Sequence, residues 1–575
     1  MVFHQTTYKL LSEVRKKMNN LMRTIFNSVS NRVLSPITLP EKWKNISADK
    51  LIKQFVIYLA IADDTKRAKV IIGKGSDIQE AITSAINNWI KLGDQSLKVK
   101  HVKVDLVKKV RIMKRFGNLK SKLTIDTGID GLAFDKDFAL SFSPQEVEAY
   151  KLVKDRKINL ERIAFAINNQ LIPGDSASLQ TQKHLKLYKF TTESFYANEK
   201  EEVCLVRGHR IFNKLTRGDL EEAIKLTQKN YFIKVINKKG KQKYSYLPHI
   251  DLNEKRYNIL RHAGTIYSIL ESIELFHSDS LLKKSQLSLE FLIRKMEKRE
   301  INGKDTLVLV ERDVLKLGGN ALAIVALAKY TSLTSDKQYI PVMQKLATWI
   351  KETQADNGDF MIHKQTYSNE KIFSFRSDFY TGEAILALVR LYELDNNEMW
   401  LDAAEKATDF LVNNKNKNAT EENVHFDHWL LYGINNLTRY RPNDSFFAHA
   451  MLIGKSLIKK QYIGDKYPEE WQGGFPPEVG KYPKSVPVAC RSEGLANIYN
   501  MIKDKDSEFA KEIKQTFRLA VEFQMQMQLR DEKVMYFENK KLTLGAFHNK
   551  FKDIELRNDF TQHNISSLVA LYKYL

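Results

Sequence analysis

Two patterns of hydrophobic and polar positions divide this chain. Up to about residue 200, apolar runs and alternating stretches are mixed with one helical repeat. The predicted strands are residues 53–61, 68–73 and 99–113, and the predicted amphipathic helix is residues 78–92. Such mixed periods predict an α+β domain over residues 51–200. Residues 1–50, whose last part contains the segment SPITLPEKW, are predicted to form a basic, partly helical arm.

From Arg217 onward the pattern is almost purely helical, and two kinds of helix alternate strictly. The first kind is apolar nearly all round and opens with polar or glycine residues: 261–273, 318–331, 382–394, 427–440, 492–502 and 562–575. The second kind is apolar on one face only: 219–235, 281–296, 339–354, 400–414, 446–461 and 509–528. Helices that are apolar all round are buried, whereas one-sided helices face solvent.

Six helical hairpins, each with one buried and one exposed helix, predict a ring of six inner and six outer helices. This pattern resembles the (α/α)6 toroid, or six-hairpin, superfamily, and the resemblance covers about residues 205–575. The predicted fold class is therefore multidomain: an N-terminal α+β domain followed by an all-α (α/α)6 toroid. The alternative is an open α-solenoid, whose terminal helices are usually polar caps. The last helix here is as apolar as the second, which favours closure of the ring.

In a toroid the N-termini of the inner helices point to one end of the ring, so their polar residues should converge there. Helix N-termini also favour anions. The predicted site residues are Arg261, His262, Asn320, Asp378, Tyr380, Glu383, Asp427, His428, Trp429, Arg491, Glu493, Arg557, Asp559, Gln562 and His563. Carboxylates, imidazoles, arginines and aromatic rings are the groups that a sugar-processing site needs.

Two reaction types remain open from the sequence. Hydrolysis would use Asp378 or Glu383 as one carboxyl group and Asp427 or Asp559 as the other. Epimerisation or elimination would use a histidine as proton carrier, and the candidates are His262, His428 and His563. The other predicted site residues would bind substrate. Each residue also has a structural alternative, because Asp427, Ser492 and Asp559 could cap helices and His262 could be a hydrogen-bonded core residue.

Two local resemblances point toward glycans. The segment RNDFTQHN, residues 557–564, is similar to an element near the C-terminus of glucuronyl C5-epimerases, which act on uronic-acid polymers. Arg557, Asp559 and His563 match, but Phe560 stands where that family has a catalytic tyrosine. Histidines at inner-helix starts also resemble those of the N-acylglucosamine 2-epimerase family, where two histidines exchange the proton.

In the N-terminal domain, the segments TGIDGLAF and FALSFSP resemble the sheet of the AMMECR1 family, without any functional implication.

The positive charge is concentrated in the N-terminal third. Residues 1–200 contain 35 Lys and Arg against 20 Asp and Glu, and so hold 15 of the 22 net positive charges. This excess predicts binding of an anionic polymer, unless it is simply a solvated basic surface.

The alternative to an enzyme is a non-catalytic toroid that binds a glycan or a protein. The predicted partner of the toroid is an oligosaccharide or polysaccharide.

Two cysteines, Cys204 and Cys490, exclude a disulfide framework and a four-cysteine metal site, so no metal or cofactor is expected. No stretch approaches the ~18 apolar residues of a membrane span. The N-terminal stretch is interrupted by charges and lacks the apolar core of a signal peptide. A cytoplasmic protein is therefore expected.

Overall fold

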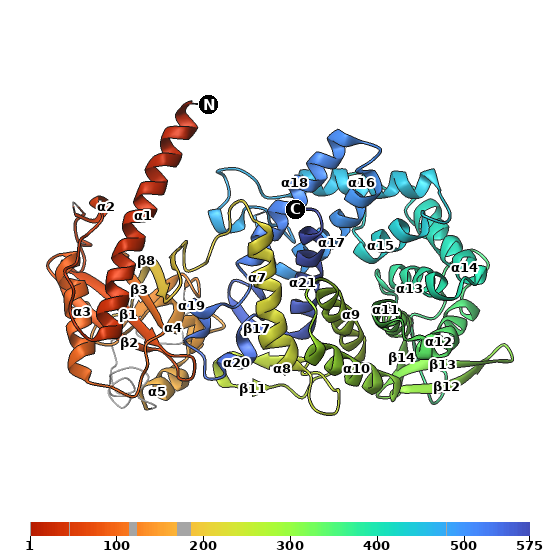
Figure 1. The fold of residues 1–575 in the computed structure, drawn as a ribbon, viewed down its shortest axis with the longest axis horizontal. Coiled ribbons are helices and arrows are strands. Elements are labelled where there is room, and N and C mark those ends of the chain that lie inside the picture. The colour runs from red at the N-terminus through yellow and green to blue at the C-terminus, as the bar shows by residue number, and fades with distance from the viewer. Residues whose placement is uncertain (1, 45, 114–123, 169–185, 479) are drawn as a thin grey trace.

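The computed structural model describes residues 2–44, 46–113, 124–168, 186–478 and 480–575, with residues 2–16 described by their backbone alone. Two parts lie next to each other: a sheet with its covering helices, and a ring of helices (Figure 1). The predicted order, an α+β region followed by a helical toroid, is confirmed.

The N-terminal part is built on one antiparallel sheet of seven strands. Their bounds are β1 Phe55–Ala62, β2 Lys69–Gly75, β3 His101–Ile112, β4 Asp130–Ala133, β5 Ser141–Phe142, β8 Tyr188–Asn198 and β9 Glu202–Leu205. The order across the sheet is β2-β1-β3-β8-β4-β5, and β9 pairs with β8. The remaining elements are α1 Val2–Asn31, α2 Glu41–Lys44, α3 Ile78–Leu92, α4 Pro144–Ala149, β6 Val153–Lys154, β7 Lys157–Ile158 and α5 Leu160–Asn168.

Both faces of β1 are buried, which explains its unbroken apolar sequence. Ile57 and Leu59 face the core formed with α1 and α3, while Tyr58 faces the opposite side of the sheet. The predicted helix 78–92 is confirmed as α3. Asp77 caps its first turn, and Gly93 ends it at φ +64°, a left-handed conformation that glycine adopts without a steric penalty.

The C-terminal part contains twelve principal helices in six hairpins. The inner helices are α9 Ile259–Leu275, α11 Leu317–Thr334, α13 Tyr380–Asp395, α15 His428–Leu437, α17 Ser485–Ile502 and α21 Asn558–Tyr572. The outer helices are α7 Arg217–Thr227, α10 Asp279–Ile293, α12 Ile340–Glu352, α14 Glu398–Asp409, α16 Asp444–Lys460 and α18 Ser507–Met525. Helix α8 Ile233–Val235 continues α7 through the π-helical turn Gln228–Phe232, and the short helices α19 Asp531–Val534 and α20 Lys540–Thr543 lie between α18 and α21.

The ring is closed. Each inner helix packs against the next, and α21, the last element of the chain, packs against both α17 and α9. The outer helix that covers α21 is α7, from the start of this part. The last hairpin therefore joins the two ends of the helical region, which explains why the final helix is apolar all round. The open solenoid is excluded.

The loops of the ring carry strands that the helical pattern concealed. Two four-stranded sheets are formed by β10 Ser245–Leu247, β11 Leu252–Asn253, β16 His548–Lys550 and β17 Asp553–Arg557, and by β12 Met296–Ile301, β13 Lys304–Glu311, β14 Val314–Lys316 and β15 Lys364–Thr366. The almost purely helical pattern from Arg217 onward predicted few strands in this region, and that prediction was wrong for these loops. Asn302 and Gly303 turn the β12–β13 hairpin, both with positive φ, which is a strong hairpin signal.

The two parts meet at the segment between α18 and α21. Ala68 donates its backbone N–H to Met535 O over 2.7 Å. Arg210 forms ion pairs with Glu201 of the N-terminal part and Glu532 of the helical part, at 2.8 and 2.9 Å. Apolar side chains of both parts also belong to one continuous core. The sheet and the ring are therefore joined by a packed, hydrogen-bonded interface.

We propose that residues 206–216, between β9 and α7, separate two folding units. Lys214 is exposed there and Arg217 is exposed at the first position of α7, so brief trypsin treatment should cut after them. We expect two stable fragments that stay together in gel filtration, because the interface is buried. The measurement is mass spectrometry of the fragments. Persistent cleavage inside the ring, with residues 206–216 protected, would contradict two units.

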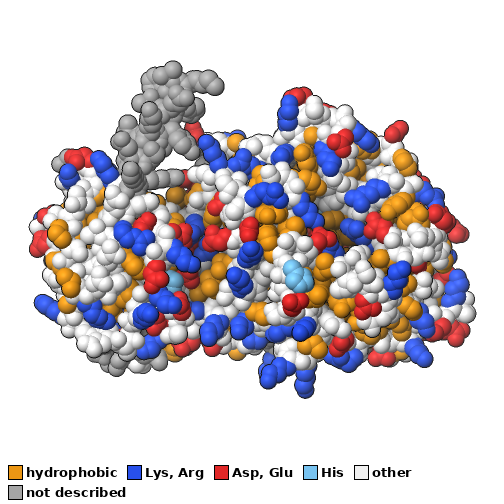
Figure 2. All heavy atoms as spheres, in the orientation of Figure 1, with side chains coloured by type: hydrophobic (Ala, Val, Ile, Leu, Met, Phe, Trp, Pro, Cys, Tyr) orange, Lys and Arg blue, Asp and Glu red, His pale blue; other side chains and the backbone are white. Residues whose placement is uncertain are grey.

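The surface mixes both signs of charge, since Lys and Arg side chains lie among Asp and Glu side chains over the face shown in Figure 2. Within the described ranges, no helix is both long and apolar enough to cross a membrane.

Candidate active site

A cavity of about 680 Å³ lies where the first turns of the inner helices meet. Five of the six inner helices contribute lining residues to it, and among the predicted site residues these are Arg261, Tyr380, Glu383, His428, Trp429, Arg491 and His563. The predicted convergence of inner-helix starts is thus observed for these seven side chains. What each does depends on its partners.

His563 of α21 is held by a buried carboxyl group. Its Nδ1 lies 2.9 Å from Glu493 Oε1 of α17, and Tyr432 donates its hydroxyl to Glu493 Oε2 over 3.2 Å. Burial lowers the pKa of His563, but neighbouring Cys490 and Glu493 outweigh burial and raise the pKa to about 10. His563 is therefore a protonated imidazolium at neutral pH, with its ring orientation fixed by Glu493.

His428, at the start of α15, has the opposite character. It is 3% exposed, and neither ring nitrogen has a hydrogen-bond partner among the described residues. Burial and the nearby charge of His563 lower the pKa of His428 well below its usual value, so the ring is neutral. An unsatisfied buried polar group costs about 1–3 kcal/mol, a cost that a bound hydroxyl or carbonyl group would remove.

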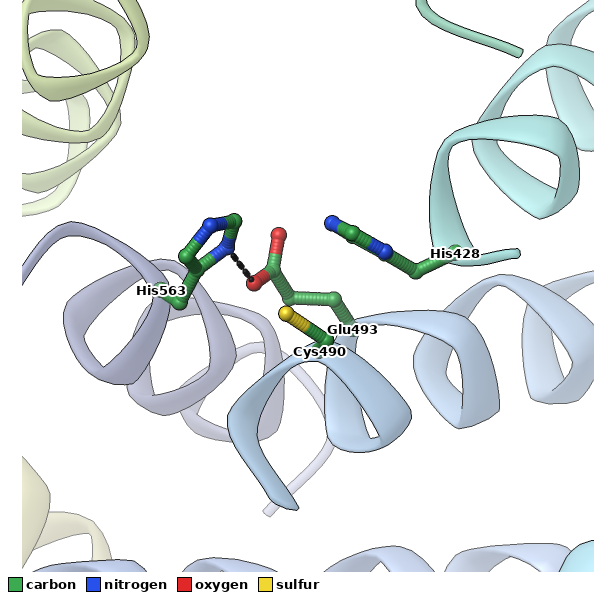
Figure 3. Close-up of side chains that lie close together, drawn as sticks. All are labelled: His428, Cys490, Glu493 and His563. Carbon is green, nitrogen blue, oxygen red and sulfur yellow. Dashed lines mark hydrogen bonds and ion pairs between the residues drawn. The ribbon is translucent and has the colours of Figure 1, made fainter. Parts of the chain in front are cut away.

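The two histidines lie next to each other, with ring centroids 5.3 Å apart. Figure 3 shows them directed toward the same point together with Cys490 and Glu493, from α15, α17 and α21. Cys490 and Glu493 are three residues apart on α17 and so share one face of that helix. A neutral and a protonated imidazole side by side form a ready acid–base pair.

These four side chains also have donor atoms that suit a divalent metal. One ligand atom from each of His428, Cys490, Glu493 and His563 lies within 4.8 Å of the others. The sequence predicted no metal from the cysteine count, and only the fold brings one thiol together with two imidazoles. Zn²⁺ binds such donors. If Glu493 keeps its hydrogen bond to His563, it orients that imidazole and does not itself bind the metal, and the positive charge of Arg261 in the same cavity wall would oppose a cation.

A chain of ion pairs positions Arg261 at the cavity wall. Asp559 is 2% exposed and accepts two hydrogen bonds from Arg557, at 3.0 and 2.5 Å. Its Oδ2 also lies 3.5 Å from Arg261 Nε. Asp559 therefore does not cap α21. Burial raises its pKa, but the Arg261 and Arg557 charges outweigh burial and lower it below the usual range, so Asp559 is ionised.

Arg491 provides a second positive charge on the wall. Its guanidinium lies over Phe426 and Phe475, 5.4 and 5.6 Å from the ring centroids, and donates to Pro487 O over 3.0 Å. No carboxylate pairs with it in the described part of the chain. A stacked guanidinium without a counter-ion is well placed to bind an anionic substituent.

Two buried carboxyl groups, Glu383 and Asp427, have raised pKa values. Burial raises the pKa of Glu383 well above its usual value, and it raises the pKa of Asp427 to about 8. Asp427 Oδ1 caps α15 through the N–H groups of Trp429 and Leu430, at 2.9 and 3.2 Å. Glu383 needs a glycine beside it, because a Cβ at Gly318 would lie 2.0 Å from its Oε2.

Eight predicted site residues do not line the cavity. Asp427, Glu493, Arg557 and Asp559 are described above, and the other four are Asp378, His262, Asn320 and Gln562. Asp378 is exposed, 4.0 Å from Lys415. His262 faces away from the ring centre, between Tyr257 Oη at 2.7 Å and Ser288 O at 2.9 Å. Asn320 and Gln562 are buried between elements: Asn320 joins α11 to β13, and Gln562 packs against Gly264. Their contacts are structural.

The sequence missed several lining residues: Asn258, Ser377, Phe379, His425, Phe426, Lys460 and Cys490. Most lie in loops just before an inner helix, where the helical period carries no information. The aromatic and histidine residues of HFDHW, 425–429, were the available signal for cavity-lining residues.

The observed starts of two inner helices also differ from the predicted ones. Helix α17 begins at Ser485, so Ser492 is an interior residue that accepts from Gln524 over 2.7 Å, and His563 lies in the second turn of α21.

Comparisons with known proteins find only solved structures of low similarity. No protein-family model matches the chain, and no curated protein sequence matches it. Among solved structures, a variant of an α-1,6-mannanase of Salegentibacter sp., in complex with α-1,6-mannotetrose, shares 14% identity, covering 63% of this chain and all of that one, with a TM-score of 0.44. A cellobiose 2-epimerase from Bacillus thermoamylovorans shares 12% identity over 63% of this chain and all of that one, with a TM-score of 0.48. A D-mannose isomerase shares 12% identity over 63% and 98%, with a TM-score of 0.47. At these identities the similarity concerns the fold alone.

Proposed function

We propose that this protein is a carbohydrate-active enzyme that moves a proton on a carbon next to a carbonyl or carboxylate group of a sugar, as epimerases, isomerases and lyases do. The observation that carries the proposal is the pairing of neutral His428 with protonated His563 in the wall of one cavity. His428 is the general base for the C–H proton, and His563 is the acid toward the developing oxyanion.

The other residues of the cavity fit this chemistry. Glu493 accepts from His563 Nδ1, which directs the other N–H of the imidazolium away from the carboxylate. Arg261, fixed by Asp559, and Arg491, stacked on aromatic rings, would bind a carboxylate of the substrate. Tyr380, which is partly exposed in the cavity wall, offers a face on which a sugar ring can stack. The similarity of residues 557–564 to glucuronyl C5-epimerases is consistent with a uronate-containing substrate.

Glycoside hydrolysis is the second candidate, because Glu383 and Asp427 are adjacent buried carboxyl groups with raised pKa. Hydrolysis requires one protonated and one ionised carboxyl group across the scissile bond. Burial raises the pKa of both of these groups, which disfavours an ionised partner, and ionised Asp559 is occupied by two arginines. The acid–base requirements of proton transfer are therefore met more completely than those of hydrolysis.

The test is incubation of the protein in D₂O with a panel of reducing sugars, uronates and uronate oligosaccharides. We expect deuterium at the carbon next to the carbonyl or carboxylate group, detected by NMR and mass spectrometry. Treatment with a chelator should leave the exchange rate unchanged, because the proposal uses no metal. New reducing ends without deuterium incorporation would favour the hydrolase, and loss of exchange after chelation would favour a metal enzyme.

A further inference from the structure

A second cavity, about 430 Å³, lies on the sheet of the N-terminal part. Five cationic side chains line it against two carboxylates: Lys108, Lys109, Arg111, Lys189 and Arg207 against Asp126 and Asp130. Thr191 and Thr192 add hydroxyl groups. Nothing in the reaction proposed above uses this cavity.

A β-bulge builds the cationic side of this cavity. Strands β3 and β8 pair regularly as far as Val107 opposite Thr192, and the pairing resumes at Val110 opposite Phe190. Lys108 and Lys109 thus oppose the single residue Thr191. In a regular strand these two lysines would point to opposite faces, but here both line the cavity. Bulges that redirect side chains are typical of functional sites.

The positive charges are only partly neutralised. Lys108 lies 3.6 Å from Glu193, Lys189 lies 3.1 Å from Asp130, and Arg207 lies 2.7 Å from Glu470. The described residues offer no ion-pair partner to Lys109 or Arg111, both of which are exposed. The cavity therefore presents two uncompensated cations next to three paired ones, a combination that favours a ligand with more than one negative charge.

The cavity is close to the catalytic one, and a single hairpin connects them. Asp126, in its wall, accepts hydrogen bonds from Tyr482, at 3.2 Å, and from Lys552. Three residues before Lys552, Asn549 accepts from the backbone N–H of Val486 over 3.1 Å. Val486 lines the catalytic cavity. Three residues span at most about 11 Å, and the Lys552 and Asn549 side chains with their hydrogen bonds add to that distance, so an oligomer of several sugar residues is needed to reach both cavities.

We propose that this bulge-built cavity is a subsite for the carboxylates of an acidic oligosaccharide whose reacting end lies between His428 and His563. This inference rests on the proposed function and names its substrate class, a uronate-containing polymer rather than a free monosaccharide. Nucleic acid is a poorer fit, because the aromatic ring in the wall, Phe190, is 1% exposed and cannot stack on a base.

The experiment measures binding of hexagalacturonate and of galacturonate to the full-length protein by calorimetry, at 50 and 200 mM salt. Wild type should bind the hexamer at least tenfold more tightly than the monomer, and the difference should shrink at higher salt. The variant Lys109→Gln/Arg111→Gln should lose this tenfold preference. The matched control is Lys154→Gln/Lys157→Gln, which removes two exposed charges of the same domain outside the cavity and should keep the preference.

The outcomes separate this inference from the proposed function. If the Lys109/Arg111 variant binds the hexamer as wild type does, the subsite is wrong, whatever the exchange assay gives. If the preference is lost in that variant but no deuterium exchange occurs with any uronate, the subsite stands and the proposed reaction is wrong. A 12-nucleotide RNA that binds more tightly than the hexamer, and loses affinity in the same variant, would overturn the assignment to a glycan.

Discussion

Replacing His563 by glutamine is expected to lower the rate of deuterium exchange by about 10²–10⁴-fold, the usual contribution of a general acid or base. His563 is a protonated imidazole in the cavity wall, and an amide cannot replace it as a proton donor. His428→Gln should have an effect of the same order, because it removes the neutral base. Initial rates of exchange in D₂O, measured with saturating substrate, test both variants.

The pH dependence gives an independent check. His428 stays neutral from well below pH 6.5 upward, whereas His563 loses its proton near pH 10. Exchange should therefore be constant through neutral pH and should fall as the pH passes about 10. His262→Gln is the matched control, because that buried histidine lies outside the cavity. It should lower the melting temperature and leave exchange intact. Full exchange in His563→Gln would refute the mechanism.

Replacing Asp427 by asparagine is expected to stabilise the protein increasingly as the pH rises. The folded-state pKa of Asp427 is about 8, raised by burial from an ordinary value of 3.8. The folded protein therefore keeps a proton that the unfolded chain releases above pH 3.8. Wild type loses stability at up to about 1.4 kcal/mol per pH unit between these values, and the loss levels off above pH 8. Asparagine keeps the capping oxygen and does not ionise.

Urea unfolding at pH 5, 6, 7, 8 and 9 measures this effect. The free energy of unfolding of Asp427→Asn minus that of wild type should grow by on the order of a few kcal/mol from pH 5 to pH 8 and then stay constant. The exposed Asp465→Asn is the control for a general effect of removing one carboxylate. A difference that does not vary with pH would mean that Asp427 is ionised in the folded protein.

Much of the ring could be predicted from the sequence, because the distinction between inner and outer helices is a distinction in apolar surface. Helix α11 is buried on almost every side, whereas α14 alternates apolar and charged residues, and each pattern is visible in the chain. The same holds for α3, whose cap residues Asp77 and Gly93 mark both ends. The β12–β13 hairpin could also be predicted from the sequence, because Asn302 and Gly303 are typical turn residues.

The candidate site could be predicted only in outline. His262 and His428 look alike in the sequence, since both stand in the first turn of an apolar helix. His262 hydrogen-bonds toward the outer helix α10, whereas His428 faces the cavity without a partner. One residue along a helix turns a side chain by about 100°, so the register of the helix in the ring decides which histidine meets substrate.

The sequence by itself determined which helices would be buried, that they would form six pairs, and that polar groups would gather where the inner helices begin. These are consequences of local periodicity. Only the tertiary structure brought Cys490, Glu493 and His563 together, bound Asp559 to two arginines and placed two lysines of a bulge on one side of a strand. The contacts of Glu493 with His563 and of Arg261 with Asp559 join residues tens to hundreds of positions apart. The pKa values of these groups depend on burial and on neighbouring charges that arise only when the ring closes.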